Sequence, residues 1–375
     1  MLKINNKFQF TRQGLIYLVV ISLVIALLFC LAFLWGFYTK KNNIFPYYQL
    51  RQIYEGISSD SQERIKPDLT IESEVIGESF LDPSSKRKYL ETALLIPKSL
   101  TKVERKTVGK AQIISATLYG VTVKATLAKA AVEKKCLRIY IDGHGSSSLY
   151  PYTSRENENL ISGGCDVLFM SMLGIDVNAG NASFPTRFGQ LNLDMTQAKN
   201  HGNYSFFYDK SNKQLDPLSI FISPHYYIIK AITDGYKNIS LIGLSGGGWY
   251  VTFLSALMPD INTSVSYAGT LPFEYRKFSK NHGDWEQVYS HIYNRISYWS
   301  LYFLGTLNAD YAATRVLYLI YNSNDPCCFS SPFANHFKGI LESFSLKGVK
   351  VIIVKKTEHQ LDFSLINLLL GNEEF

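Results

Sequence analysis

Short apolar runs along the chain predict most of the fold. Six of them are continuous and end at polar residues, as strands buried on both faces of a parallel sheet do. They cover 137–141, 167–172, 239–244, 264–268, 316–321 and 349–355. Helical patterns lie between or after them, over 217–235, 248–258, 332–346 and 360–370. This alternation predicts an α/β fold, a mostly parallel central sheet with helices on both faces.

Two regions depart from this alternation. Before residue 130, β-branched residues alternate or cluster between Pro, Gly and charged residues, which predicts N-terminal antiparallel strands. The expected strands are 69–76, 89–96, 111–118 and 121–128. An aromatic-rich stretch over about 270–314 is too long for a simple crossover, and it predicts a helical cap insertion over one end of the sheet.

The longest apolar run, Gly14–Phe37, contains no charged residue. About 20 apolar residues cross a bilayer as a helix. Trp35 near its end and Lys40 just after it suit the lipid–water interface. We therefore expect one transmembrane helix over 14–38, after a short tail over 1–13, and a cleaved signal peptide remains the alternative.

The polar, mixed composition of residues 39–65 predicts a stalk, and residues 66–375 are expected to form one folded domain. Basic residues lie on both sides of the apolar run, so the positive-inside rule is nearly balanced. Single N-terminal anchors usually leave a short N-terminus in the cytoplasm. The expected location is therefore a single-pass membrane protein with an extracytoplasmic folded domain.

Composition and charge exclude two classes of protein. The chain is 46% hydrophobic and 14% aromatic, too apolar for a disordered protein. Its net charge of +7 comes largely from five basic residues before residue 42, and no acidic residue precedes Glu55. A nucleic-acid-binding protein needs a basic face on its folded part, so we expect no nucleic-acid partner.

Cysteine and histidine spacings predict no metal site and no cofactor. Cys136 and Cys165 each directly precede a strand-like run. They would form a disulfide if those strands are neighbours, and would otherwise be buried thiols. The adjacent pair Cys327 and Cys328 could also form a bridge, but the sequence gives little support for it.

The strand-like run 239–244 leads directly into a glycine-rich turn and a helix. Residues 243–247 fit the pattern G-x-S-x-G in the strand–turn–helix context that makes it meaningful, which predicts Ser245 as a nucleophile. A serine hydroxyl needs a base, and the base needs an acid to orient it. Asp325 and His359 follow the last two predicted strands, where these groups are expected. Asp284 and Asp310 are alternatives for the acid.

Hydrolysis of an acyl group also needs hydrogen-bond donors for the oxyanion. The N–H of Gly246, next to the nucleophile, is one expected donor. The glycine-rich turn after 137–141 is expected to supply the other, from Gly145 or Ser146, while His144 shapes that loop. An ordinary strand-to-helix turn is the alternative reading of this segment.

These motifs together resemble those of the α/β-hydrolase superfamily. The resemblance covers about Leu137–Phe375 and, more weakly, the β-rich stretch before it. It rests on the His-Gly loop 142–146, the serine turn 243–247, and Asp325 and His359 after the last two predicted strands. It is similar to acetyl-esterase-like and dienelactone-hydrolase-like members.

The resemblance implies a membrane-anchored serine hydrolase that cleaves a carboxylic ester of a small-molecule or acylated substrate. The catalytic residues would be Ser245, Asp325 and His359. His144, Trp249 and Trp285 are expected to contact substrate. An amidase or peptidase of the same fold, or an inactive anchored binding protein, are the alternatives.

Overall fold

The computed structural model describes most of the chain after residue 76 and a short part before it. The described residues are 20–35 without 26, 29 and 33, 77–109, 111–131, 135–144, 160, 164–194, 198–276, 283–288, 291–329, 333–344 and 346–371. The chain divides into two compact units, Met1–Pro67 and Asp68–Phe375.

In the first unit, the described residues of 20–35 are helical. Within the described part of the chain, none of the helices combines the length and the apolarity that a bilayer crossing needs. The transmembrane helix over 14–38 therefore stays a prediction. The tail over 1–13 and the stalk over 39–65 lie outside the described residues.

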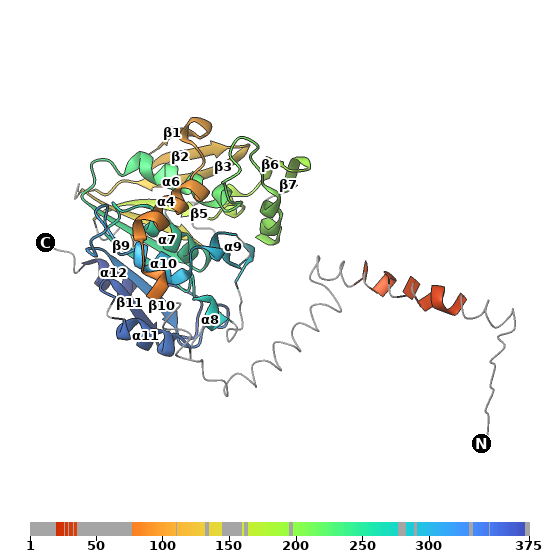
Figure 1. The fold of residues 1–375 in the computed structure, drawn as a ribbon. Coiled ribbons are helices and arrows are strands. Elements are labelled where there is room, and N and C mark those ends of the chain that lie inside the picture. The colour runs from red at the N-terminus through yellow and green to blue at the C-terminus, as the bar shows by residue number, and fades with distance from the viewer. Residues whose placement is uncertain are drawn as a thin grey trace, which may run out of the picture. The chain divides into compact units, whose positions relative to one another are not determined.

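The second unit is built on a nine-stranded sheet with the order β1-β2-β3-β5-β4-β8-β9-β10-β11 (Figure 1). Its strands are β1 (Lys102–Val108), β2 (Ala111–Leu118), β3 (Val121–Ala128), β4 (Cys136–Asp142), β5 (Asp166–Ser171), β8 (Asn238–Leu244), β9 (Thr263–Tyr267), β10 (Val316–Asn322) and β11 (Val349–Val354). The pairs β1–β2, β2–β3 and β3–β5 are antiparallel, and every later pair is parallel. This confirms the mostly parallel sheet that the apolar runs predicted.

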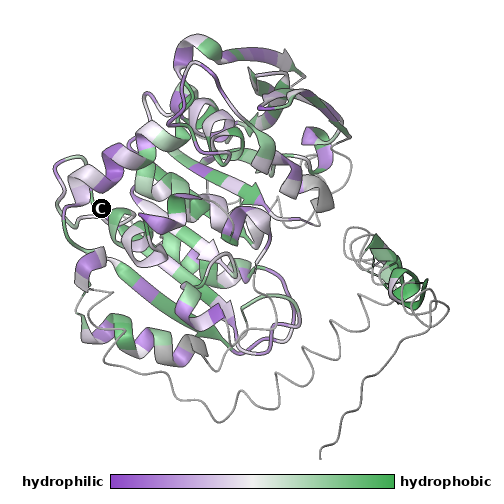
Figure 2. Cartoon of the chain, turned by 45° about the vertical axis from the view of Figure 1, so that its right-hand side comes forward, coloured by the Kyte–Doolittle hydropathy of each residue, from purple (hydrophilic) through white to green (hydrophobic). Residues whose placement is uncertain are grey.

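Helices cover both faces of this sheet because its strands are apolar on both faces. In β8, Ile239 and Leu241 enter one core, and Ile242 enters the core on the opposite face. The first core receives side chains from α4 (Pro83–Leu94), α6 (Ser219–Ile232), α7 (Gly246–Leu257), α10 (Tyr298–Leu304) and α11 (Phe333–Ser343). The second receives them from α12 (Phe363–Gly371). Figure 2 shows the hydrophobic colour gathered along the central strands and their covering helices.

The strand expected over 89–96 is wrong, because this stretch lies largely in helix α4. The side chain of Asp82 accepts the backbone N–H of Ser85, and a proline occupies the first turn, both typical of a helix start. Leu90, Ala93 and Leu94 follow helical spacing and are buried. The strand expected over 69–76 lies outside the described residues, and β1 was not expected.

The insertion predicted over about 270–314 contains short helical segments. They are α8 (Phe273–Arg276), α9 (Trp285–Val288), η5 (His291–Asn294) and α10. Helix α10 packs against α7, and its Trp299 and Tyr302 are buried in the main core. A second excursion from the sheet holds η3 (Asp176–Asn178), the hairpin of β6 (Asn181–Thr186) and β7 (Gly189–Asp194), and η4 (Ala198–Phe206).

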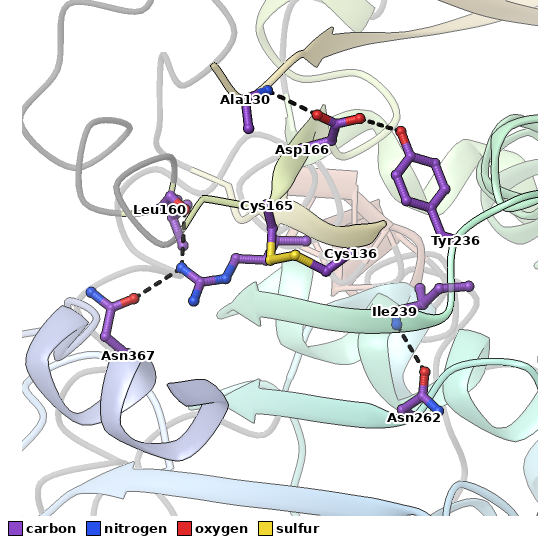
Figure 3. Close-up of a disulfide and its surroundings, with 10 residues drawn as sticks. Ala130, Cys136, Leu160, Cys165, Asp166, Tyr236, Ile239, Asn262 and Asn367 are labelled. Carbon is purple, nitrogen blue, oxygen red and sulfur yellow. Dashed lines mark hydrogen bonds between the residues drawn. A yellow bond between two sulfur atoms is a disulfide. The ribbon is translucent and has the colours of Figure 1, made fainter. Parts of the chain in front are cut away.

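Cys136 and Cys165 form a disulfide, the first of the two alternatives left open by the sequence (Figure 3). Cys136 is the first residue of β4, and Cys165 directly precedes β5, its parallel neighbour. The bond therefore lies at the amino ends of these strands. Asp166 beside it accepts hydrogen bonds from Ala130 and Tyr236 (Figure 3).

Candidate active site

Ser245 occupies a strained turn between β8 and α7. Its backbone has φ 54° and ψ −122°, in a region that side-chain-bearing residues rarely adopt. The turn is held by a hydrogen bond from the N–H of Ser245 to the carbonyl oxygen of Tyr267, 2.8 Å away on β9. Such strain at the end of a buried strand presents a serine hydroxyl at the sheet edge.

Close backbone packing explains the glycines around this turn. A Cβ atom on Gly247 would overlap the carbonyl group of Ile141 in β4. A Cβ atom on Gly143 would come 2.8 Å from the Cβ of Ser245. The turn after β4 therefore lies directly against Ser245, which requires small residues on both sides of the contact.

Asp325 and His359 form a hydrogen-bonded pair. Asp325 follows β10 and His359 follows β11, and Oδ2 of Asp325 lies 2.7 Å from Nδ1 of His359. The Asp325 side chain is fully buried, whereas that of His359 is 22% exposed. The carboxylate favours the imidazole tautomer with its proton on Nδ1, which leaves Nε2 free to accept a proton.

Backbone groups fix the position of Asp325. Its Oδ1 accepts the N–H groups of Cys327 and Cys328, at 2.8 and 3.1 Å. Cys327 and Cys328 are joined by a disulfide, which had little support from the sequence. Their sulfur atoms and a ring nitrogen of His359 lie within 4.8 Å of one another. The short bridged loop thus touches both members of the pair.

Asn322, the last residue of β10, holds the segment around His359. Its side-chain N–H₂ group donates to the carbonyl oxygens of Glu358 at 2.6 Å and Gln360 at 3.2 Å. The hydroxyl of Tyr267 donates to its Oδ1 at 2.6 Å. Asn322 is not among the residues predicted from the sequence. The available signal was a polar side chain at the end of a buried apolar strand.

The sheet order brings the predicted catalytic residues to one edge. β8, β9, β10 and β11 are parallel neighbours in that order. Ser245, Asp325 and His359 follow the carboxyl ends of β8, β10 and β11, so all three lie at the same sheet edge. Ligands of open α/β sheets bind at this edge.

The expected oxyanion donors are only partly described. Gly246 is the first residue of α7, so its N–H is not used inside the helix. Gly145 and Ser146 lie outside the described residues. Asp142 and His144 of the same loop are described, and the buried carboxylate of Asp142 accepts the N–H of Gly143 at 2.8 Å.

The three residues expected to contact substrate differ in their surroundings. Trp249 is fully buried, and its indole N–H donates to the hydroxyl of Tyr293 at 3.0 Å. Trp249 lies in the main hydrophobic core and not at the sheet edge, so its role is in packing. Trp285 is half-buried and packs near Phe221, with ring centroids 6.4 Å apart.

His144 faces two carboxylates of the insertion. Its Nδ1 lies 3.5 Å from Asp284 and its Nε2 lies 3.4 Å from Glu286. Burial lowers the pKa of His144, but the nearby carboxylates of Glu286 and Asp284 outweigh it and raise that pKa. Burial would raise the pKa of Glu286, but the charge of His201 and the contacts with His144 hold it well below its usual range. No sequence pattern pointed to Glu286 or His201.

Among the comparisons with known proteins, only the comparison with solved structures finds matches. No family model matches the chain, and no curated protein matches its sequence. An acetyl xylan esterase from a Thermoanaerobacterium species has 14% identity and a TM-score of 0.46, over 77% of this chain and 92% of that one. A glucuronoyl esterase from Caldicellulosiruptor kristjansonii has 12% identity and a TM-score of 0.48, over 77% of this chain and 82% of that one.

An acylaminoacyl peptidase from Pyrococcus horikoshii has 14% identity and a TM-score of 0.44. The match covers 73% of this chain and 41% of that one, so the chain spans less than half of the peptidase's length. The fold is assigned from the sheet itself. An antiparallel start, a parallel remainder and a strained serine turn after β8 give the architecture that the resemblance to α/β-hydrolases implied.

Proposed function

We propose that the chain is a serine hydrolase that cleaves carboxylic esters through an acyl-enzyme. One observation carries the proposal. A serine in a strained strand-to-helix turn lies at the same sheet edge as a histidine that a buried aspartate holds at 2.7 Å. A packing role would require neither the strained serine nor the aspartate–histidine pair.

In the proposed reaction, Nε2 of His359 accepts the hydroxyl proton of Ser245 as Oγ attacks the ester carbonyl carbon. The carbonyl π electrons move to the oxygen, which becomes the oxyanion. When the tetrahedral intermediate collapses, the carbon–oxygen bond to the alcohol breaks, and His359 gives its proton to the leaving alkoxide. Asp325 stabilises the imidazolium that exists between these two steps.

Water then releases the acyl group by the same steps. His359 takes a proton from water as the water oxygen attacks the acyl carbon. The bond to Ser245 breaks, and the proton returns to its Oγ. The products are a carboxylic acid and free enzyme, so atoms and charge balance without a further reactant.

The oxyanion is assigned to backbone N–H groups. Gly246 supplies one, at the amino end of α7, where the helix dipole also favours negative charge. Gly145 or Ser146 supplies the second, in the loop that begins at Gly143, which contacts the serine turn. Trp285 is retained as a substrate contact, since it is half-exposed in the insertion.

A matched panel of esters and amides tests this proposal on the full-length chain in detergent. We expect hydrolysis of short-chain p-nitrophenyl esters that is lost in Ser245→Ala and His359→Ala and retained in Ser343→Ala. Ser343 is an exposed serine on α11 and serves as the control. Faster cleavage of the matched amides would assign an amidase or peptidase instead. Ester hydrolysis that persists in Ser245→Ala would overturn the mechanism.

We further propose that the apolar run 14–38 anchors the enzyme, with the folded unit outside the cytoplasm. The support is the uncharged run itself and the two disulfides, which form and persist in oxidising compartments. Alkaline carbonate extraction should leave the protein in the membrane pellet. Protease added to intact cells should digest the folded unit. Protection of that unit until the membrane is opened would contradict the orientation.

A further inference from the structure

A cluster of metal-binding side chains lies beside the serine turn. His144 comes from the loop after β4, His201 from η4, and Glu286 from α9. Each offers one ligand atom, and these atoms all lie within 4.8 Å of one another. The three residues are defined here as the His–His–Glu cluster. None of them is a member of the proposed catalytic triad.

The cluster is buried and only partly hydrogen-bonded. His201 is 3% exposed and Glu286 is fully buried. Nε2 of His144, Nε2 of His201 and Oε1 of Glu286 find no hydrogen-bond partner among the described residues. A buried polar atom without a partner is costly, because it loses its interaction with water and gains nothing in return. Two of these atoms, Nε2 of His144 and Oε1 of Glu286, face each other 3.4 Å apart, which points to a missing ligand between them.

The spacing of the cluster fits a metal ion better than a set of direct hydrogen bonds. Nε2 of His144 lies 3.4 Å from Oε1 of Glu286, and Nδ1 of His201 lies 3.3 Å from Oε2. Ionic N–H···O bonds are about 2.7–2.9 Å long. Ligand atoms about 2.0–2.2 Å from a tetrahedral zinc ion lie roughly 3.3–3.6 Å apart. The two distances lie close to this range, each to a different oxygen of Glu286, and one ligand atom from every residue lies within 4.8 Å of the others.

We propose that the His–His–Glu cluster binds one zinc ion. Two imidazole nitrogens and one carboxylate oxygen are a ligand set that zinc accepts, with water in the fourth position. Asp284 lies 3.5 Å from Nδ1 of His144, on the ring nitrogen opposite the one that faces Glu286. This is the place of the carboxylate that commonly orients a zinc-bound histidine. The charges of Glu286 and Asp284 together balance that of Zn²⁺.

Such a site would join three segments that are distant in sequence. His201 and Glu286 alone are 85 residues apart, which explains why no spacing along the chain predicted it. Nδ1 of His144 would lie 2.9 Å from a Cβ atom on Gly246, so the imidazole ring that would bind the ion packs against the serine turn. The zinc would hold the loop after β4 against η4 and α9. This role is separate from the hydrolytic reaction.

Zinc titration of the EDTA-treated full-length chain tests the proposal. Calorimetry and metal analysis should find one zinc ion per chain, and the bound ion should raise the melting temperature. His201→Ala and Glu286→Gln should each lose this stoichiometric binding. His291→Ala should retain it, because His291 is exposed and outside the cluster. Absence of stoichiometric zinc from the folded wild type would overturn the proposal and leave a hydrogen-bonded network.

X-ray absorption of the zinc-loaded wild type identifies the ligands without any variant. We expect nitrogen and oxygen ligands at about 2.0–2.2 Å and no sulfur. The second group that could hold a metal among the described residues is Cys327, Cys328 and His359, which would be available after reduction of the disulfide. Sulfur ligands at about 2.3 Å would place the ion there and contradict the His–His–Glu cluster.

Discussion

Oδ2 of Asp325 lies 2.7 Å from Nδ1 of His359, while Oδ1 of the same carboxylate accepts two backbone N–H groups. Three hydrogen bonds therefore fix the carboxylate of this buried aspartate. A turn aspartate with no further role would hold the backbone alone. Asp325 holds the backbone and the histidine at once, so the proposed orientation of the base depends on it.

Asp325→Asn is expected to lower kcat about 10³- to 10⁴-fold with little change in KM. The amide keeps the shape of the carboxylate but favours the wrong imidazole tautomer and cannot stabilise the imidazolium. Steady-state kinetics on a p-nitrophenyl ester measures this. Asp310→Asn is the control, since Asp310 is an exposed aspartate of the insertion and an alternative acid in the sequence. A larger loss in Asp310→Asn would reassign the acid.

Asn322→Ala should reduce kcat roughly 10- to 100-fold, because a displaced His359 no longer meets the serine well. The variant loses both hydrogen bonds to the carbonyl groups that flank His359. It should also lose about 1–3 kcal/mol of unfolding free energy, since it leaves the buried hydroxyl of Tyr267 without its acceptor.

Asn262→Ala provides the comparison for Asn322. Its side chain accepts the N–H of Ile239 at 2.8 Å, near the amino end of β8 and away from the site (Figure 3). We expect its melting temperature to fall while kcat stays unchanged. If kcat falls equally in both variants, Asn322 acts on stability and not on the position of His359.

The two disulfides should have opposite effects. Replacing both Cys136 and Cys165 by Ser should cost about 3 kcal/mol of unfolding free energy, because the bond closes a long loop with a sequence separation of 29. Because this bond lies at the amino ends of β4 and β5, away from the candidate catalytic residues, kcat should stay unchanged. Urea unfolding and ester kinetics measure the two quantities.

Replacing both Cys327 and Cys328 by Ser should leave the free energy of unfolding almost unchanged, because a bridge between adjacent residues closes almost no loop. It should lower kcat several-fold, since the two N–H groups that hold Asp325 lose their covalent constraint. Unchanged kcat in this variant would show that the backbone alone positions Asp325.

Arg87→Met is expected to destabilise the folded unit by more than about 3 kcal/mol without changing kcat. The buried guanidinium donates to the carbonyl oxygens of Ala256, Leu304, Leu307 and Asn308, so it joins α4 to α7 and α10. Removing it leaves several carbonyl groups unpaired at once. Chemical denaturation checks this, and a loss below 1 kcal/mol would contradict the docking role of Arg87.

The parts of the fold that were predictable from sequence share one property. The parallel strands are continuous apolar runs whose burial on both faces leaves a clear pattern, as in 239–244. Ser245 and His359 were predictable for a related reason, because each follows one of these apolar runs in the chain.

The rest depended on contacts between distant segments. Tyr89, Thr92 and Ile96 suit a strand, but the Leu, Ala and Glu residues between them suit a helix. The helix begins before this stretch, at Asp82 and Pro83. Trp249 was expected to contact substrate because of its size and its place just after the serine turn, but helix α7 buries it in the core. The His–His–Glu cluster joins three segments, and no local pattern could show it.

The most direct test of the central proposal is covalent labelling of the full-length chain by a fluorophosphonate probe, followed by mass spectrometry of the labelled peptide. An activated serine reacts, whereas an ordinary one does not. We expect one adduct, on Ser245, absent from His359→Ala and still formed in Ser343→Ala. A folded wild-type protein that takes no label, or takes it on another serine, would contradict the proposal.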